Sequence, residues 1–384
     1  MKRSASKQET VVVVGAGMVG HHFCARLREL DRDNRFRLVL IGEEPRAPYD
    51  RMNLTQYYER GDGDALRLAE PNFYGEHQIE LHVRERATAI DRKRKTLALE
   101  RARIQSYDTL IIATGSSAFM PSIPGIDKRG VFAYRTLDDL AAIARYAKTV
   151  ERVAVLGGGL LGLEAARAMQ ALGLETHVVE LAPRLMPRQL DDAGAQLLLH
   201  RIRALGVTTL LGSATRAILG DVACTGLRFE DGSELAVDMV VVSAGITPRD
   251  DLARGAELAI GAHGGIVVDD ALRTSDPNVF AIGECAIHRG VIYGLVAPGY
   301  DMAEVVAKQL IGQAATFTGT DRSAKLKLLG VEVAMFGDPF DASRPTRDVV
   351  LHDRVKGIYK RLVVSEDAKR LLGGILVGDA AEYG

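Results

Sequence analysis

Two stretches of the chain follow the same order: a β-branched run, a glycine-rich turn, a helical segment, a second strand and an acidic residue. The first starts at residues 11–14 and contains the turn glycines Gly15, Gly17 and Gly20. The second starts at residues 153–156 and contains Gly157, Gly159 and Gly162. In such a turn one glycine allows the tight bend, one lets the backbone approach a pyrophosphate, and one lets helix and strand pack closely. The duplication therefore predicts two dinucleotide-binding domains.

An acidic residue closes each stretch. Strand 37–41 is followed by Glu43 and Glu44, and strand 176–179 is followed by Glu180. A carboxylate at this place accepts hydrogen bonds from the ribose hydroxyls of a dinucleotide. Glu180 would oppose a 2′-phosphate and so favours NADH over NADPH, although Arg184 close by could reduce that preference. Two sites in one chain suit a resident flavin and an exchanging nicotinamide, between which hydride passes.

The remaining pattern predicts an α/β fold with two Rossmann-like domains, as in glutathione reductase, plus a small C-terminal α+β domain. Further strands are expected at residues 79–90, 95–99, 109–113, 227–229, 239–242 and 279–282, the last returning to the first domain. Strands at 325–333, 359–364 and 371–377 would form the third domain. We expect a FAD-binding domain at 1–115 and 245–315, an NADH-binding domain at 116–244, and the C-terminal domain at 316–384.

Composition narrows the class of function. The 384 residues carry a formal net charge of -1, which favours neither nucleic acid nor an anionic membrane. No apolar run approaches the ~18–20 residues of a spanning helix, and the basic start MKRSASKQET precedes only four valines, so a cytoplasmic protein is expected. Cys24, Cys224 and Cys285 form no C-x-x-C, and the nine histidines show no ligand spacing apart from the adjacent pair His21 and His22, for which surface or packing roles are expected. No metal site is predicted.

Longer segments resemble a known family over almost the whole chain. EEPRAPYDRMNL, YDTLIIATGS, LGGGLLGLEAA and TSDPNVFAIGEC resemble the two-dinucleotide-domain flavoprotein reductases. GLVAPGY, AKLKLLGVEV and GILVGDAAEYG are similar to the amino-terminal FAD/NADH part of the assimilatory nitrite reductase large subunit, and to the related flavoprotein subunit of assimilatory nitrate reductase. The resemblance implies an NADH-dependent flavoprotein reductase.

The resemblance also implies site residues. For FAD it implies the first glycine turn together with Val19, Glu43, Glu44, Arg51, Gln56, Ala87, Ala113, Thr114, Gly115, Arg135, Gly283, Glu284, Ala297 and Pro298. For NADH it implies Gly157, Gly159, Leu160, Leu161, Gly162, Glu180 and Gly245, with Glu164 near the reacting rings as the catalytic candidate. Taken alone, Arg51 and Arg135 would more often be surface charges, and Glu164 a partner of a helix dipole. Ferredoxin-reductase relatives have lysine and aspartate in place of Gln56 and Glu284.

The implied partner is an electron acceptor that the chain lacks. In the resembled family an iron–sulfur and siroheme part follows, or a molybdenum centre receives the electrons. Nothing follows Gly384, so a fragment or a subunit served in trans is expected. A rubredoxin or ferredoxin reductase with a small iron–sulfur partner is the alternative enzyme, and an FAD-binding redox sensor is the non-enzyme alternative. A homodimer is left open.

Overall fold

The computed structural model describes residues 8–61, 63–320, 323–328, 330–341 and 343–383. The chain divides into two compact units, which are described separately below. The first unit comprises residues 1–53, 63–117 and 246–320, and the second comprises 54–62, 118–245 and 321–384. Residues 1–7, on which the expected cellular location partly rests, lie outside the described part of the chain.

The first unit is built around a parallel sheet in the order β19-β7-β1-β2-β3. Its strands are β1 (Glu9–Val14), β2 (Phe36–Ile41), β3 (Ile79–His82), β7 (Thr109–Ile112) and β19 (Val279–Ala281). The apolar runs of β1 and β7 are buried, as expected for parallel strands covered on both faces. The predicted return of residues 279–282 to this sheet is confirmed, because β19 pairs with β7.

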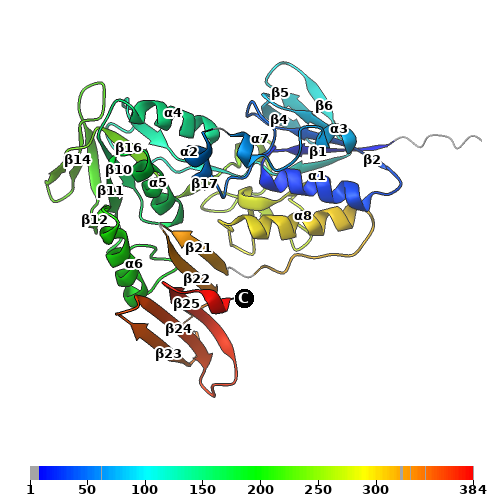
Figure 1. Cartoon of the computed structure of the whole chain (residues 1–384). Coiled ribbons are helices and arrows are strands. Elements are labelled where there is room, and N and C mark those ends of the chain that lie inside the picture. Colours follow the sequence, from blue (N-terminus) through cyan, green and yellow to red (C-terminus); the bar gives the residue numbers. More distant parts are fainter. Residues whose placement is uncertain (1–7, 62, 321–322, 329, 342, 384) are drawn as a thin grey trace, which may run out of the picture. The chain divides into compact units, whose positions relative to one another are not determined.

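Two long helices lie side by side in this unit, α1 (Met18–Leu30) and α8 (Val296–Leu310) (Figure 1). Smaller elements complete it: α3 (Phe73–Glu76), α7 (Asp251–Gly255), the antiparallel sheet of β4 (Ala87–Asp91), β5 (Thr96–Leu99) and β6 (Ile104–Ser106), and the parallel pair β18 (Ile266–Val268) and β20 (Ala286–His288). The prediction of one strand over residues 79–90 is wrong. Arg84 takes a left-handed φ of 54° and turns the chain, so β3 and β4 fall in different sheets.

The second unit has its own parallel sheet in the order β12-β11-β10-β16-β9. Its strands are β9 (Val131–Ala133), β10 (Arg152–Leu156), β11 (Glu175–Glu180), β12 (Thr208–Leu211) and β16 (Met239–Val242). The helices are α2 (Gln56–Arg60), α4 (Leu137–Ala147), α5 (Leu160–Ala171) and α6 (Asp192–Ala204), and a small antiparallel sheet holds β13 (Thr215–Leu219), β14 (Gly226–Phe229) and β15 (Glu234–Leu235). The second glycine turn therefore joins β10 to α5, as predicted.

The C-terminal part of the second unit is an antiparallel sheet in the order β21-β22-β25-β24-β23 (Figure 1). Its strands are β21 (Ala324–Leu328), β22 (Val331–Gly337), β23 (Thr346–Asp353), β24 (Ile358–Ser365) and β25 (Leu371–Val377). The predicted strand 325–333 is two strands that turn at Gly330, whose φ is 83°, and β23 was not predicted. Helix α6 packs on β24 and β25, and the Tyr359 hydroxyl donates to Asp191 over 2.5 Å.

Candidate nucleotide-binding sites

In the first glycine turn, between β1 and α1, two glycines are closed, because an added Cβ would clash with backbone atoms. The third glycine is open, because an added Cβ would meet nothing. Gly15 has a φ of 116°, and a Cβ there would lie 2.1 Å from the Ala113 carbonyl oxygen. A Cβ on Gly20 would lie 2.1 Å from the Gly15 carbonyl oxygen. A Cβ on Gly17, in contrast, would meet nothing within 4 Å, and Gly17 caps α1 without a side-chain hydrogen bond. The backbone N–H groups at the start of α1 are thus accessible to an anionic group such as a pyrophosphate.

The acids after β2 are each held by an arginine. Arg249 donates to both carboxylate oxygens of Glu43, and this hydrogen bonding lowers the pKa of Glu43. Glu44 accepts from the Tyr49 hydroxyl over 2.8 Å and from Arg51. A carboxylate offers about four lone-pair sites, so an oxygen bound to an arginine can still accept from a ribose hydroxyl. Glu43 and Glu44 therefore remain suitable ribose acceptors with fixed orientations.

Packing around Val19 joins α1 to α8 and to the turn after β19. A Cβ on Gly299, in α8, would lie 2.5 Å from Val19 Cγ2, and one on Gly283 would lie 3.3 Å from it. Gly283 and Glu284 form the short 3-10 helix η2 (Gly283–Cys285), in which Glu284 accepts a hydrogen bond from the Ser116 hydroxyl over 2.7 Å. Three segments far apart in sequence are thereby brought together in the first unit.

The chain segment that follows β7 lies next to η2, because Ser116 donates a hydrogen bond to Glu284. The Thr114 hydroxyl donates to the Arg249 carbonyl oxygen over 2.6 Å, and the Arg249 N–H donates to the Gly115 carbonyl oxygen over 2.9 Å. Gly115 has a φ of 67° and open space where a side chain would begin. Ala297 and Pro298 stand in the first turn of α8. The free N–H groups of that turn give it a partial positive charge.

The predicted FAD residues divide between the two units. The first unit holds Gly15, Gly17, Val19, Gly20, Glu43, Glu44, Arg51, Ala87, Ala113, Thr114, Gly115, Gly283, Glu284, Ala297 and Pro298. The second unit holds Gln56, at the start of α2, and Arg135, whose N–H donates to the Asp139 carboxylate that caps α4. Their approach to FAD remains a prediction.

The second glycine turn, between β10 and α5, repeats the geometry of the first. Gly157 has a φ of 117°, and a Cβ there would lie 2.3 Å from the Ser243 carbonyl oxygen. A Cβ on Gly162 would lie 2.0 Å from the Gly157 carbonyl oxygen, whereas one on Gly159 would meet nothing within 4 Å. Gly159 caps α5 without a side-chain hydrogen bond, and Leu160 and Leu161 form the first turn of that helix. Both turns therefore combine tight packing with one open position.

Glu180 closes the second turn with both of its carboxylate oxygens. One accepts from the Gly158 N–H over 2.6 Å, and the other accepts from the Ala182 N–H over 2.7 Å. The Arg184 guanidinium points elsewhere: it donates to the carbonyl oxygens of Pro187 and Leu190 and to the Asp192 carboxylate. Arg184 is therefore engaged away from Glu180, and the expectation that it softens the preference against a 2′-phosphate gains no support.

Glu164 lies in α5, close to the second glycine turn. Burial raises its pKa to about 7, although the nearby Arg167 acts in the opposite direction. Gly245, which follows β16, has a φ of 121° and open space at its Cβ position. The protonation of the Glu164 carboxyl group therefore changes near neutral pH.

The three cysteines are buried and free. Burial raises the pKa of the Cys24 thiol to about 12 and also raises the pKa of Cys285. The Cys285 thiol donates to the Ile282 carbonyl oxygen over 3.3 Å. A thiol in such surroundings is protonated and inert, so Cys285 has a structural role despite its place beside Glu284.

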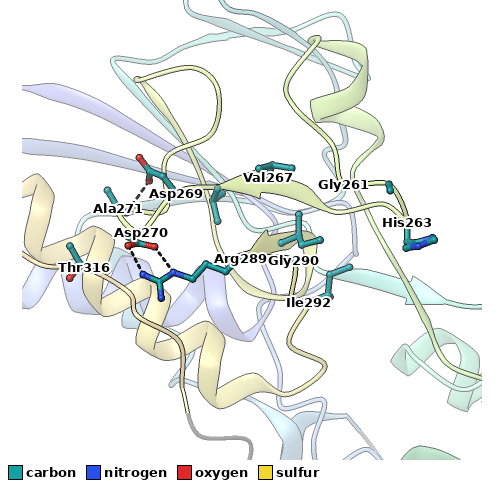
Figure 2. Close-up of a pocket in the computed structure, with 13 residues that line it drawn as sticks. Gly261, His263, Val267, Asp269, Asp270, Ala271, Arg289, Gly290, Ile292 and Thr316 are labelled. Carbon is teal, nitrogen blue, oxygen red and sulfur yellow. Dashed lines mark hydrogen bonds and ion pairs between the residues drawn. The ribbon is translucent and has the colours of Figure 1, made fainter. Parts of the chain in front are cut away.

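A surface hollow of about 1010 Å³ lies in the first unit around β18 and β20 (Figure 2). The residues that line it include Val267, Asp270, Ile287, Arg289 and Ile292, and none of the predicted nucleotide-binding residues is among them. Arg289 and Asp270 pair over 2.7 Å, and the hydrogen bonds from Arg289 and His288 lower the pKa of Asp270 to about 2. Within the first unit, the hollow is therefore separate from the first glycine turn.

Sequence reasoning missed two residues that shape the first site, Arg249 and Ser116. Arg249 lies in the segment SAGITPR, but its partner Glu43 is 206 residues away. Ser116 follows the predicted Gly115, and its partner Glu284 is 168 residues away. No local sequence pattern links Arg249 or Ser116 to its carboxylate, because only the fold brings these distant residues together.

A family model described as pyridine nucleotide-disulphide oxidoreductase matches residues 9–309. The chain is 48% identical to the nitrite reductase [NAD(P)H] large subunit of Klebsiella oxytoca over 97% of the chain and 39% of that protein. It is 36% identical to the assimilatory nitrate reductase electron transfer subunit of Bacillus subtilis over 98% of the chain and 48% of that protein. The chain thus spans less than half the length of these relatives.

Among solved structures, the chain is similar to a ferredoxin reductase from Rhodopseudomonas palustris. The TM-score is 0.88 at 30% sequence identity, and the match covers 98% of this chain and 93% of that one. Unlike the two relatives above, this protein is matched over almost its full length.

Proposed function

The chain belongs to the pyridine nucleotide-disulphide oxidoreductase family, whose members bind FAD and NAD(P)H, and we propose that it passes electrons from NADH through FAD to the iron–sulfur and siroheme centres of a nitrite reductase. We also propose that the enzyme is cytoplasmic. The same transfer of electrons from NADH through FAD would also supply a molybdenum-dependent nitrate reductase.

The observation that carries this proposal is the pair of open glycine positions, Gly17 and Gly159. Each lies in a turn whose other two glycines are closed by backbone atoms within 2.4 Å of a Cβ position. Close packing therefore explains four of the six glycines. The other two leave space for the protein backbone to approach a bound pyrophosphate. A chain with one nucleotide site would need only one such open turn.

FAD, when bound, supplies two-electron chemistry: it accepts hydride from NADH and releases the electrons to the acceptor. The protein's part is to bind and orient. The start of α1 would take the pyrophosphate of FAD, and Glu43 and Glu44 its adenosine ribose. The start of α8, with Ala297 and Pro298, would favour negative charge on the flavin's pyrimidine end. The start of α5 and Glu180 would hold NADH in the same manner.

Glu164 is the residue that would adjust the polarity of the nicotinamide site. With a pKa of about 7, its carboxyl group is divided between the neutral and charged forms near neutral pH. The neutral form can donate a hydrogen bond and the charged form can accept one. Hydride transfer itself requires no base, because position and electrostatics suffice. Glu164 therefore acts by contact with the bound nucleotide.

A ferredoxin reductase is the second candidate, favoured by the match to the Rhodopseudomonas palustris structure over 93% of its length. Its acceptor would be a small iron–sulfur protein. Gln56 and Glu284 depart from the lysine and aspartate of ferredoxin-reductase relatives, and identity to the nitrite reductase is higher, at 48%. An FAD-binding sensor would not need the second open turn at Gly159.

The acceptor distinguishes these functions. We expect the isolated, FAD-loaded chain to oxidise NADH with ferricyanide, and to show no nitrite- or nitrate-dependent oxidation until a cluster-bearing partner is added. Reduction of nitrite to ammonium takes six electrons, and the three buried cysteines provide no cluster ligand set. The measurement is NADH absorbance with each acceptor in turn, under anaerobic conditions.

Three results would contradict the proposal. Nitrite turnover by the chain alone would reveal an overlooked metal site. Failure with every artificial acceptor would favour the sensor. Stimulation by a rubredoxin or ferredoxin, but not by a siroheme-bearing partner, would select the ferredoxin-reductase alternative.

The preference between NADH and NADPH tests the proposed role of Glu180 at the ribose. We expect NADH to be favoured over NADPH by about 10–100-fold in kcat/KM, corresponding to roughly 1–3 kcal/mol for a carboxylate facing a 2′-phosphate. Glu180→Ala should reduce this ratio several-fold. Glu175→Ala, at the exposed start of the same strand, is the matched control and should leave the ratio unchanged. Equal efficiency with both nucleotides in the unaltered protein would refute the assignment.

A further inference from the structure

The backbone of Arg249 is fixed within the first unit, directly after β17 (Ile246–Pro248). Its N–H donates to the Gly115 carbonyl oxygen over 2.9 Å, and its carbonyl oxygen accepts from the Thr114 hydroxyl over 2.6 Å. Both contacts use backbone atoms of Arg249, so they do not depend on its side chain. A substitution at this position therefore removes the guanidinium and leaves the path of the chain in place.

The guanidinium of Arg249 forms a two-pronged pair with Glu43. Nη1 donates to one carboxylate oxygen, and Nη2 donates to the other over 2.8 Å. Two parallel hydrogen bonds fix both the direction and the plane of a carboxylate. Exposed ion pairs usually contribute little, but a bidentate arginine–carboxylate pair is an exception. Both side chains are only 36% exposed, which limits the competition from water.

Other charges surround this pair without replacing it. Arg86 Nε lies 3.9 Å from Glu43, beyond hydrogen-bond distance. The hydrogen bonds from Arg249 are the largest cause of the lowered pKa of Glu43. The remaining charged groups that act on one or the other member of the pair are Arg51, Glu44 and Asp251. Arg249 is therefore the main determinant of the orientation and charge of the Glu43 carboxylate.

Orientation and charge are what a ribose acceptor requires. A glutamate has several rotatable bonds, and fixing such a side chain at the moment of binding reduces affinity. Glu43 is already fixed by Arg249 before a ligand arrives. An ionised carboxylate has about four lone-pair sites, so two remain for ribose hydroxyls when the arginine occupies the other two. The pair is thus preorganised for a vicinal diol.

We propose that Arg249 is a positioning residue for FAD, which acts through Glu43 and sets how tightly and down to what pH the adenosine end of the cofactor is bound. This inference rests on the proposed function, because it requires FAD at the first glycine turn with its adenosine ribose at Glu43. Arg249 itself makes no contact with FAD.

The first test is the affinity for FAD, measured by flavin fluorescence as FAD is titrated into protein from which it has been removed. We expect Arg249→Ala to raise the dissociation constant at least about tenfold. The matched control is Arg254→Ala, in α7, which removes the same charge at a side chain that is 60% exposed and pairs with Asp250 over 3.3 Å. Asp250 keeps its hydrogen bond from the Gly265 N–H, so this control should bind FAD normally.

A double-mutant cycle shows whether Arg249 acts through Glu43. Glu43→Ala alone should weaken FAD binding, because the ribose acceptor is lost. Adding Arg249→Ala to Glu43→Ala should then change the dissociation constant by less than about twofold, because the residue through which Arg249 acts is already absent. A direct contact between Arg249 and FAD would instead give the same loss in both backgrounds.

The pH at which FAD is released gives a readout that a purely structural role would not move. Glu43 accepts from ribose hydroxyls when it is ionised, and its lowered pKa keeps it ionised to a lower pH than an ordinary glutamate. Without Arg249 the pKa of Glu43 rises towards its ordinary value. FAD release on acidification should therefore begin at a higher pH in Arg249→Ala than in the unaltered protein or in Arg254→Ala.

Four results would overturn this inference: normal FAD affinity in Arg249→Ala, an equal loss in Arg254→Ala, an undiminished effect in the Glu43→Ala background, or an unchanged pH of FAD release. Far-ultraviolet circular dichroism of each variant confirms that the fold is intact. Failure of the unaltered protein to bind FAD at all is a different outcome, because it would overturn the proposed function itself and remove the premise of this inference.

Discussion

Gly17→Val is expected to give a folded but colourless protein. A Cβ at Gly17 would meet no protein atom within 4 Å, so the added side chain leaves the packing of β1 and α1 intact. The valine would instead occupy the space where the backbone approaches the pyrophosphate of FAD. We expect FAD affinity to fall at least about 100-fold, corresponding to ~3 kcal/mol, with loss of the visible flavin absorbance and of NADH oxidation.

Two glycine variants serve as controls for Gly17→Val. Gly75→Val, at an exposed position with nothing within 4 Å of its Cβ, should keep normal FAD content. Gly15→Val should lose its fold as well as its flavin, since its φ of 116° is strained for valine and its Cβ would lie 2.1 Å from a carbonyl oxygen. Far-ultraviolet circular dichroism separates the two effects. Normal flavin content in Gly17→Val would place the pyrophosphate elsewhere.

The parts of the fold that could be predicted are those in which sequence and structure are locally coupled. A β-branched run, a turn of spaced glycines and a helical stretch lie within about 30 residues. Each dinucleotide-binding motif can therefore be recognised from consecutive residues. Both glycine turns, their helices and the acids that close them were predicted for this reason. The return of residues 279–282 to the first sheet was predicted from the strand pattern along the chain, and the pairing of β19 with β7 confirms it.

Other features depend on contacts that no local pattern contains. The pairing of Glu43 with Arg249 joins β2 to a loop 206 residues away, so sequence alone could not reveal which charge would orient that carboxylate. The turn at Arg84 rests on a left-handed φ in a residue that rarely adopts one. Strand β23 escaped prediction because its three apolar residues are consecutive, whereas a half-buried strand alternates.

The second glycine turn permits a variant that separates the two nucleotides. Gly159→Val adds a side chain where nothing lies within 4 Å, at the start of α5. Because this turn belongs to the second unit and the first glycine turn is unaltered, the variant should purify yellow, with normal FAD content. We expect the rate of flavin reduction by NADH, at limiting NADH, to fall at least about 100-fold, since the valine would block the pyrophosphate of the nicotinamide nucleotide.

Anaerobic stopped-flow measurement of flavin bleaching decides this prediction, and chemical reduction with dithionite is its internal control. Dithionite needs no nucleotide site, so it should bleach the flavin of Gly159→Val as fast as that of the unaltered protein. Loss of both reactions would point to damage at the flavin itself. Retention of both would mean that NADH binds without the α5 turn, and the similarity of the two turns would then reflect packing alone. Opposite phenotypes in Gly17→Val and Gly159→Val, colourless in one and yellow but unreactive towards NADH in the other, would assign one nucleotide to each turn.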